Sequence, residues 1–444
     1  MLRYLRTVKS LRLWVPEHLR LCVGQVLNVD RNRSLGFSDD VHLSEAVAWL
    51  QRAQDSTGDG GVSGRFQLSR GWTSSYPETT GYIIPTWLKL SEIREDNHFI
   101  DRAEKCVRFL LSTQLKSGAF PAGEIAENRT EPSPFNSAQI IHGLIAWHRF
   151  SGEQRVLDSA NQAADWLIRV QDPDGAFRKH SYRGVPASYA AHASCWLAEL
   201  GSYTGEERYL RAATRHLDWV LKHFIDEGAW FDLCGFDVDE HKESLATAHT
   251  IAYTIFGVLY MSQLLGREDG IQAAKRAACA ALRCAELQGG VPGVMNSKWR
   301  PAANYACLTG NAQLALIWFR LFEIEGDLRY VNAALNAIDG VKRAQVMHLK
   351  HPGLRGGIPG SAPIWGDYMH CALPNWAAKF YIDALVMKKE VMNSLDASDK
   401  SALTSDADSE FTSHLTNSAQ HAAAQHFQIH DELRAKLNLP LRIA

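Results

Sequence analysis

Several features of large protein classes are missing from this sequence. Its eight cysteines form no Cys-x-x-Cys pair, and most of them lie inside apolar helical patterns such as AEKCVRFL and HASCWLAEL. We interpret them as reduced core thiols in a reducing compartment rather than as disulfides. No uncharged apolar run reaches the length of about 18 residues that a transmembrane helix needs, and the first residues lack the apolar core of a secretory signal. These absences favour a cytoplasmic protein.

The sequence also has no marked excess of either charge. Lys and Arg together number 47, and Asp and Glu 49, in 444 residues. Nucleic-acid-binding proteins usually carry a basic excess on at least one domain, so nucleic acid is not an expected partner. Only the first residues, MLRYLRTVKSLRLWVPEHLRL, combine recurring basic side chains with apolar ones. They predict an ordinary N-terminal helix, with weak contact to an anionic membrane surface as the alternative.

A turn motif is repeated along the chain. The segments FLLSTQLKSGAF (109–120) and WLIRVQDPDGAF (166–177) share the pattern aromatic-Leu-x3-Gln-x3-Gly-Ala-Phe. Comparable helix ends recur at a spacing of roughly 53 to 62 residues, which accommodates two helices and two short connections. These ends are expected near Gln54, Gln114, Gln171, Phe224, Glu286 and Gln345.

The helices of this repeat are of two kinds, and six of each can be counted. Those that precede the Gly turns, such as VLDSANQAADWLIRVQ, carry one apolar stripe and one charged face, which is typical of solvated outer helices. Their partners, such as SAQIIHGLIAWHRF, are apolar on nearly all sides and should be buried. The first outer helix, SEAVAWLQRAQ, and the last inner helix, PNWAAKFYIDALV, each lack a partner. They complete each other if the array closes into a ring, so the pattern predicts an (α/α)6 toroid.

The chain is therefore expected to be all-α with one main domain. The toroid should occupy residues 38–388, after a basic helical segment at 1–37. Residues 389–444 are rich in Ser, Asp and Ala without an apolar period. They predict a flexible polar tail with a short terminal helix, IHDELRAKL.

The Leu-x3-Gln-x3-Gly-x-aromatic turn resembles the QW repeat of triterpene cyclases, which are also α/α toroids. The resemblance ends at the turn, because the acidic DxDD motif of those enzymes is missing and FDVDEH (236–241) does not fit it. The zinc-binding signatures of protein prenyltransferases and lanthionine cyclases are also missing. A terpenoid cyclase is therefore disfavoured, and neither a metal nor a cofactor is expected.

A second resemblance extends over nearly the whole chain, to a bacterial family of six-hairpin toroids associated with exopolysaccharide and O-antigen gene clusters. It rests on YPETTGYIIPT, QDPDGAFRKH, HTIAYTIFG, WRPAANYACLTGNAQLALIWFRL, GGIPGSAPIWGDY and PNWAAKFYIDAL. Some members carry the label delta-aminolevulinic acid dehydratase, whose (β/α)8 barrel disagrees with this helical periodicity. The wider six-hairpin group includes glycosidases, uronate-processing lyases and sugar epimerases. The resemblance implies a carbohydrate-active protein of exopolysaccharide or O-antigen biosynthesis or processing, which binds a saccharide or polysaccharide in the toroid funnel.

Polar residues at the starts of the inner helices and in adjoining loops are the candidates for that funnel site. Glu78, the only carboxylate at these helix starts, is either a general acid or base or a carboxylate that matches the helix dipole. His249 and Tyr253 share one helix face and could move a proton, as could Tyr189, with hydrogen-bonded core residues as the alternative. The expected substrate-binding residues are Tyr82, Asn136, His192, Arg300, Asn311, Trp365, Asp367, Tyr368, Asn375, Trp376 and Lys379.

The residue types at these positions bear on the reaction. Glycoside hydrolysis usually needs two positioned carboxylates, and Glu78 has no evident partner outside the loops. His, Tyr, Asn and Arg are more abundant, which favours proton abstraction beside a uronate carboxylate, leading to elimination or epimerisation. A six-hairpin glycoside hydrolase and a non-catalytic glycan-binding or assembly protein are the alternatives.

Overall fold

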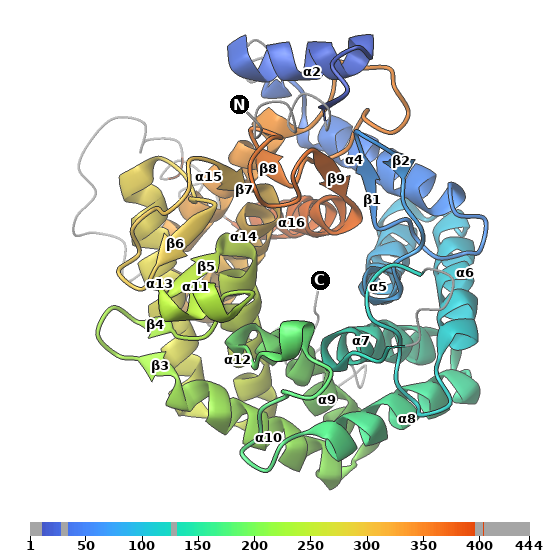
Figure 1. Ribbon diagram of the computed structural model, residues 1–444, viewed down its shortest axis with the longest axis vertical. Coiled ribbons are helices and arrows are strands. Elements are labelled where there is room, and N and C mark those ends of the chain that lie inside the picture. Colours follow the sequence, from blue (N-terminus) through green and yellow to red (C-terminus); the bar gives the residue numbers. More distant parts are fainter. Residues whose placement is uncertain (1–10, 28–33, 126–130, 396–402, 404–444) are drawn as a thin grey trace.

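The computed structural model describes residues 11–27, 34–125, 131–395 and 403. Most of these residues form two concentric rings of six long helices each (Figure 1). The inner ring consists of α5 (Pro77–Arg94), α7 (Pro134–Ser151), α9 (Ala191–Thr204), α12 (Ala248–Leu265), α14 (Leu308–Glu325) and α16 (Asn375–Ser394). The outer ring consists of α4 (Asp39–Asp55), α6 (His98–Thr113), α8 (Gln154–Val170), α10 (Glu207–Lys222), α13 (Glu268–Gln288) and α15 (Leu328–Ala344). The predicted (α/α)6 toroid is confirmed.

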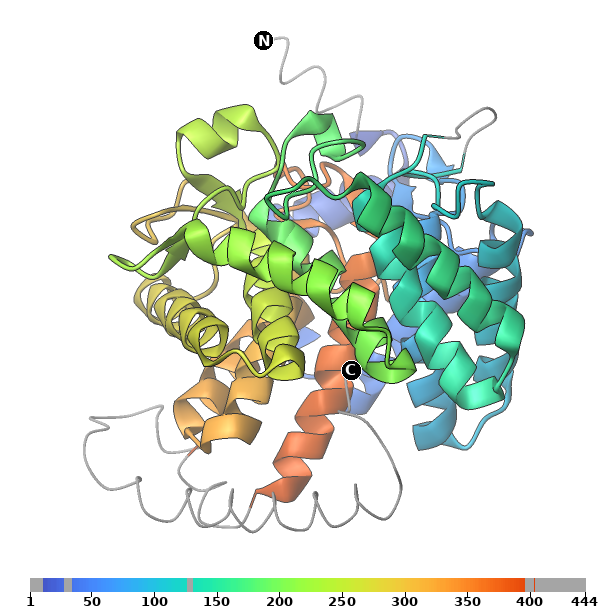
Figure 2. The same cartoon turned by 90° about the horizontal axis from the view of Figure 1, so that it is seen from below.

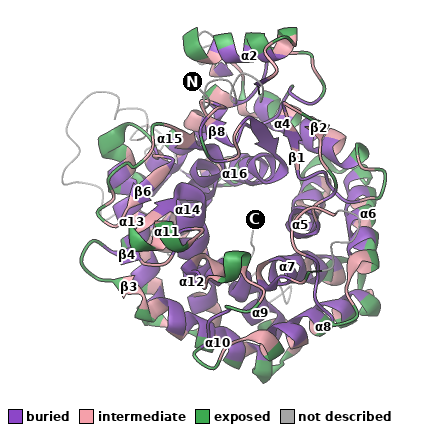
Figure 3. Ribbon diagram, in the orientation of Figure 1, coloured by how far each residue is buried: buried purple, intermediate pink, exposed green. Residues whose placement is uncertain are grey.

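The inner helices are buried on nearly every side, whereas the outer helices expose one face (Figure 3). In α9 every residue from Ala191 to Gly201 is buried. Glycines let these helices approach closely: a Cβ on Gly143 of α7 would lie 2.1 Å from the Gly81 carbonyl oxygen of α5. Since no real Cβ tolerates that distance, the narrow inner ring depends on small residues at the helix crossings.

The repeated glutamine connects consecutive outer helices. Gln114, just after α6, donates through Nε2 to the Gly118 carbonyl of its own turn (2.8 Å) and to the Ser159 carbonyl of α8 (2.9 Å). Gln171, just after α8, repeats both bonds, to its own turn and to α10. One side chain therefore closes each turn and binds the next outer helix, which explains why the motif recurs.

The same arrangement closes the ring. Gln345, just after α15, donates to the Gly356 carbonyl and to the His42 carbonyl of α4, both at 3.0 Å. The last outer helix is thereby joined to the first. The six expected helix ends all lie within two residues of the observed ends.

Short antiparallel strand pairs gather at one end of the toroid, where the inner helices begin (Figure 2). Three strands lead directly into inner helices: β5 (Leu245–Thr247) into α12, β7 (Ala306–Cys307) into α14 and β9 (Ala372–Pro374) into α16. Their partners are β6 (Val294–Asn296), β8 (Ser361–Ala362) and β1 (Arg65–Gln67). The other short elements are β2 (Gly71–Trp72), β3 (Phe224–Ile225), β4 (Trp230–Phe231), α11 (Val238–Lys242), η1 (Tyr182–Gly184) and η2 (Ser188–Ala190).

Helices α2 (Pro16–Leu27) and α16 are the first and last helices of the described residues. α2 lies outside both rings (Figure 1). α16 continues to Ser394, beyond the expected domain end at 388, because Met387 and Val391 remain buried against the core. The predicted tail, IHDELRAKL included, lies almost entirely outside the described residues. No helix within the described ranges is long and apolar enough to cross a bilayer.

Candidate active site

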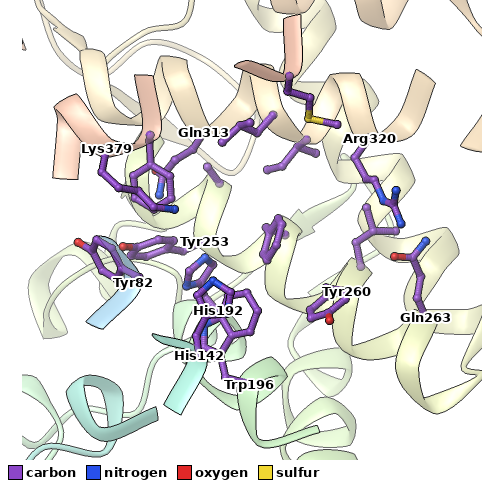
Figure 4. Close-up of a pocket in the computed structure, with 17 residues that line it drawn as sticks. Tyr82, His142, His192, Trp196, Tyr253, Tyr260, Gln263, Gln313, Arg320 and Lys379 are labelled. Atoms are coloured by element: carbon purple, nitrogen blue, oxygen red, sulfur yellow. The ribbon is translucent and has the colours of Figure 1, made fainter. Parts of the chain in front are cut away.

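A cavity lies within the inner ring, with about 830 Å³ of empty space when its open mouth is included. All six inner helices contribute to its wall. In Figure 4, Tyr82, Tyr253, Gln313 and Lys379 gather at one end, and Gln263 and Arg320 lie at the other. Apolar residues of α12 and α14, such as Leu259 and Ile317, lie along the helices between these two groups. The cavity is therefore polar at its ends and apolar in its middle.

Tyr253 is the centre of the polar end. Its ring centroid lies 4.0 Å from that of His192 and 4.2 Å from that of His249, and its hydroxyl interacts with the side chains of Tyr82 and Gln313. Burial raises the pKa of Tyr253 well above its usual value, and the nearby charge of Glu78 raises it further. The phenol therefore stays protonated and can donate a hydrogen bond.

The two histidines beside Tyr253 are held as different tautomers. The Gln139 amide oxygen accepts a 3.0 Å bond from the indole N–H of Trp196, so its nitrogen donates to His192 Nδ1. His192 therefore carries its proton on Nε2. His249 Nδ1 donates to the Gln313 oxygen at 2.8 Å, which leaves His249 Nε2 as an acceptor. Burial lowers the pKa of His249 to about 4 and that of His192 well below its usual value, so both rings are neutral at pH 7.

Lys379 brings a buried positive charge to the same end. Its Nζ lies 2.6 Å from Asp383 Oδ2, and both side chains are almost completely buried. Thr86 Oγ1 donates to the other carboxylate oxygen at 2.8 Å. Lys379 also lies 4.4 Å from the centroid of Phe380 and 5.6 Å from that of Tyr82. The ammonium group is thus held in place beside the cavity, where it can donate to a ligand oxygen.

Glu78 lies in the first turn of α5 and is buried, although it is not among the residues that line the cavity. Tyr76 donates to its Oε2 at 2.6 Å, and the Asn136 amide, oriented with its nitrogen toward acceptors, donates to the same oxygen at 3.0 Å. Burial raises the pKa of Glu78 to about 7, against the opposing effect of the Tyr76 bond. Its charge also raises the pKa of Tyr82. A carboxyl group that titrates near neutrality is thus placed among phenols at the start of the inner ring.

A second carboxyl group with a raised pKa lies on the loop side of the toroid. Glu240, in α11, is half-buried and accepts a hydrogen bond from the backbone N–H of Phe236. Burial is the main cause of its raised pKa. Burial is also the main cause of the raised pKa of Tyr189, and the charges of Glu78, Tyr182 and Glu240 raise it further. Glu78 and Glu240 therefore both lie near the Tyr189 phenol.

Four more of the expected binding residues are buried near the starts of the inner helices: Asn311, Tyr368, Asn375 and Trp376. Tyr368 and Trp376 are buried beside the site: Trp376 Nε1 donates to the Tyr368 hydroxyl at 2.9 Å, and the Tyr368 ring lies 5.6 Å from His249. Asn311 and Asn375 are buried and donate to backbone carbonyls, so both hold helix starts in place.

The loop residues lie farther from the cavity. Arg300 and Asp367 are exposed and Trp365 is half-buried, and none of the three is among the residues that line it. That these three residues contact a saccharide at the rim of the toroid stays a prediction.

Trp196 and Glu240 were not anticipated, whereas Gln139 is one of the polar residues at the inner-helix starts that the sequence already singles out. Gln139 orients His192, and Trp196 stacks on His142 with ring centroids 3.7 Å apart. Glu240 comes from FDVDEHKE (236–243), whose four acids predict a solvated loop rather than a metal site. For Trp196 the available signal was its position on an inner helix, where a buried indole N–H needs a partner.

Metal ligands are not clustered in the described residues: no group of three or more His, Cys, Asp or Glu side chains there could hold a metal ion. All eight cysteines are unpaired, and seven of them are buried.

Comparison with known protein families places these residues in context. The family model of the beta-L-arabinofuranosidase, GH127 catalytic domain, matches residues 42–277, more than half of the chain. The chain belongs to this family. In this GH127 member the match runs from α4 into α13 and so includes Glu78, His192, Glu240 and Tyr253. A search among curated protein sequences found no significant match.

Solved structures of several sugar-processing enzymes are similar in fold to this GH127 member. An unsaturated glucuronyl hydrolase specific for heparin has a TM-score of 0.63 at 15% identity, over 80% of this chain and 99% of its own. Cellobiose 2-epimerase from Bacillus thermoamylovorans B4167 has a TM-score of 0.63 at 13% identity, over 82% and 99%. The unsaturated glucuronyl hydrolase from Bacillus sp. GL1 has a TM-score of 0.61 at 16% identity, over 79% and 96%. At such identities the likeness shows the fold.

These findings establish a carbohydrate-active six-hairpin protein with a GH127-like glycoside hydrolase domain. They support the hydrolase alternative better than the lyase or epimerase reaction that the residue types favoured. The reason is the match to the GH127 catalytic-domain model, which is a glycosidase family.

Proposed function

We propose that this protein is a glycoside hydrolase that releases a terminal sugar from a small glycoside, with Glu78 as the proton donor. The observation that carries the proposal is the environment of Glu78. It is the carboxyl group of the inner ring whose pKa is raised to about 7, and it is oriented by hydrogen bonds from Tyr76 and Asn136. A carboxylic acid that keeps its proton near neutral pH can deliver it to a glycosidic oxygen as the bond breaks.

The second carboxyl group of the proposed reaction is Glu240. Glycosidases of most families pair a protonated acid with an ionised carboxylate that attacks the sugar or activates water. The pKa of Glu240 is also raised by burial, but this group is only half-buried and keeps its contact with the Phe236 N–H. That donor stabilises the ionised form, so the two environments suit a neutral acid and a charged partner.

The cavity supports binding of a small saccharide. It is concave and mostly apolar, with a few polar groups at its ends, as small-ligand sites typically are. Lys379 and Tyr253 supply donors at the polar end, and Trp196 and Phe380 supply aromatic surface on which a sugar ring can pack. Because all six inner helices enclose it, the site suits the end of a saccharide rather than the middle of a polymer.

A role in bacterial exopolysaccharide or O-antigen processing is the finer part of the proposal. It rests on the resemblance of segments such as YPETTGYIIPT and PNWAAKFYIDAL to the gene-cluster family. The sugar released would then be a terminal unit of such a surface polysaccharide or of its repeat unit.

The test is turnover of a panel of nitrophenyl glycosides that includes both anomers of L-arabinofuranoside, together with oligosaccharides that end in each sugar. We expect release from at least one member, and a loss of roughly 100- to 10,000-fold in kcat for Glu78→Gln and for Glu240→Gln. Glu227→Gln, at an exposed carboxylate in the β3–β4 turn, is the matched control and should keep full activity. If the wild-type chain binds panel sugars without cleaving any, the non-catalytic glycan-binding alternative is correct instead.

One observation favours a second candidate, proton transfer at a sugar carbon. His192 with a protonated Nε2 and His249 with a free Nε2 both contact the Tyr253 ring, so a neutral acid and a neutral base lie close together. Epimerisation would exchange a sugar C–H hydrogen for solvent deuterium. Incubation of reducing disaccharides in D₂O, followed by proton NMR, detects this exchange, and His192→Asn should abolish it while leaving aryl glycoside hydrolysis measurable.

A further inference from the structure

The N-terminal helix α2 presents an apolar face to solvent. Of the twelve exposed large hydrophobic residues among the described residues, five lie between positions 14 and 27. Leu19, Val23 and Leu27 are spaced by four, and Val26 lies beside them, so these four residues form one stripe along the helix. We refer to them as the α2 stripe. The other seven exposed hydrophobic residues are scattered over distant elements, and such isolated residues are ordinary on protein surfaces.

The opposite face of α2 is fixed to the body of the protein. His18, Leu21 and Cys22 are buried, and the His18 ring lies 6.0 Å from that of His351. The backbone N–H of Ile364 donates to Gln25 Oε1 at 2.8 Å. The helix therefore has a set orientation at the outer edge of the toroid (Figure 1), and the α2 stripe points away from the core.

Basic residues accompany the α2 stripe. Residues 1–27 contain five Lys or Arg and one acid, Glu17, a formal charge of +4, whereas the whole chain has −2. Arg20 is exposed on the turn next to Leu19 and Val23. Trp14 is 65% exposed just before the helix, with the Arg12 guanidinium 5.9 Å from its ring centroid. An exposed apolar stripe, flanking arginines and a tryptophan at one end are the elements of an interfacial helix.

We propose that α2 docks this protein on an anionic lipid surface, with the α2 stripe in the boundary between headgroups and acyl chains. Arg12 and Arg20 would lie at the phosphate level, and Trp14 would anchor the start of the helix. A second copy of the chain fits this face less well, because a two-fold contact would bring the same basic residues against themselves. The inference is independent of the reaction in the cavity, since no α2 residue lines it.

The experiment is co-sedimentation of the full-length protein with vesicles of phosphatidylcholine alone and of an equal mixture with phosphatidylglycerol. We expect partitioning onto the mixed vesicles, a weaker signal on phosphatidylcholine alone, and a decline as salt is raised. The triple variant Leu19→Gln, Val23→Gln, Leu27→Gln should lose at least tenfold in partition coefficient. Arg20→Gln should lower binding only to the anionic vesicles.

A matched triple variant at scattered exposed positions, Ile93→Gln, Phe150→Gln, Leu287→Gln, should bind vesicles as the wild type does. Every substituted residue is exposed, so both triple variants should fold as the wild type does. Circular dichroism and thermal melting check this. The proposal is overturned if the α2 variant and the control behave alike, or if binding ignores phosphatidylglycerol. It is also overturned if light scattering shows a dimer of the wild type that the α2 variant abolishes, because the occupant of the stripe is then a second copy.

Discussion

The Gln345 side-chain nitrogen donates a 3.0 Å hydrogen bond to the backbone carbonyl of His42, a residue 303 positions earlier in the chain. Gln345 also pairs through Oε1 with His42 Nδ1, and both residues are buried. The same amide that closes one local turn therefore also joins the last outer helix to the first. Local turn chemistry and ring closure depend on a single side chain here.

Replacement of Gln345 should destabilise the whole toroid. Gln345→Ala removes the bonds to His42 and to the Gly356 carbonyl and leaves buried partners unsatisfied, so we expect a loss of about 2–4 kcal/mol in the free energy of unfolding. Gln288→Ala, at the exposed end of α13, should change it by less than about 0.5 kcal/mol. Urea denaturation followed by circular dichroism measures both, and equal effects would mean that the bridge is not important for closure.

The alkaline limb of activity should report the titration of Glu78. Because its folded-state pKa is about 7 and the reaction needs the protonated form, kcat/KM should fall as pH rises through 7. A pH–rate profile on the best glycoside of the panel measures this. An alkaline limb that lies above pH 9 would show that another group is the acid.

Stability should depend on pH through the same carboxyl group. The folded chain binds the Glu78 proton more tightly than the unfolded chain, whose pKa is near 4.5. The stabilising effect of this proton is therefore complete below pH 4.5 and is lost as pH rises to about 7, a change of about 3 kcal/mol.

The lowered pKa of His249 makes stability depend on pH in the opposite direction. Its folded pKa is about 4 against 6.5, so its contribution is complete above pH 6.5 and is lost as pH falls toward 4. The Glu78→Gln variant cannot ionise at this position, whereas the wild type loses the stabilising effect of the Glu78 proton as pH rises. The variant should therefore gain stability relative to wild type between pH 5 and 7, as measured by urea denaturation at each pH. A constant difference across that range would contradict the raised pKa.

The buried Lys379–Asp383 pair should show strong coupling. Lys379→Met leaves Asp383 as an uncompensated buried charge and should cost about 3–5 kcal/mol of stability. The double variant Lys379→Met, Asp383→Leu should recover most of that loss, although the Thr86 bond is gone. A double-mutant cycle by chemical denaturation gives the coupling energy, and additive effects of the two changes would show that the pair is not energetically linked.

The double variant also separates stability from ligand binding. If Lys379 donates to a sugar oxygen, the stable double variant should still bind glycosides at least tenfold more weakly than wild type. Isothermal titration with the product sugar measures that affinity, and an unchanged value would restrict Lys379 to a structural role.

The repeat, the two kinds of helix and the closed ring follow from the sequence alone, because each rests on a local periodic pattern. Gln114 and Gln171 show why: their bonds to the Gly turn and to the next outer helix recur in every repeat that has the motif, so the motif alone indicates the arrangement. Glu78 also stood out, since a lone carboxylate at the start of an apolar helix is visible without coordinates.

Tertiary structure alone decided the electrostatic state of the site. The tautomers of His192 and His249 depend on contacts of α7 with α9 and of α12 with α14. The Lys379–Asp383 pair lies within α16, but Thr86 of α5 completes it from a position 297 residues away. For an exposed loop residue such as Arg300 the structure without a ligand decides less, and its contact with a saccharide stays a prediction. A periodic pattern specifies which face of a helix is buried, but a side chain's charge and hydrogen bonds depend on what packs against it.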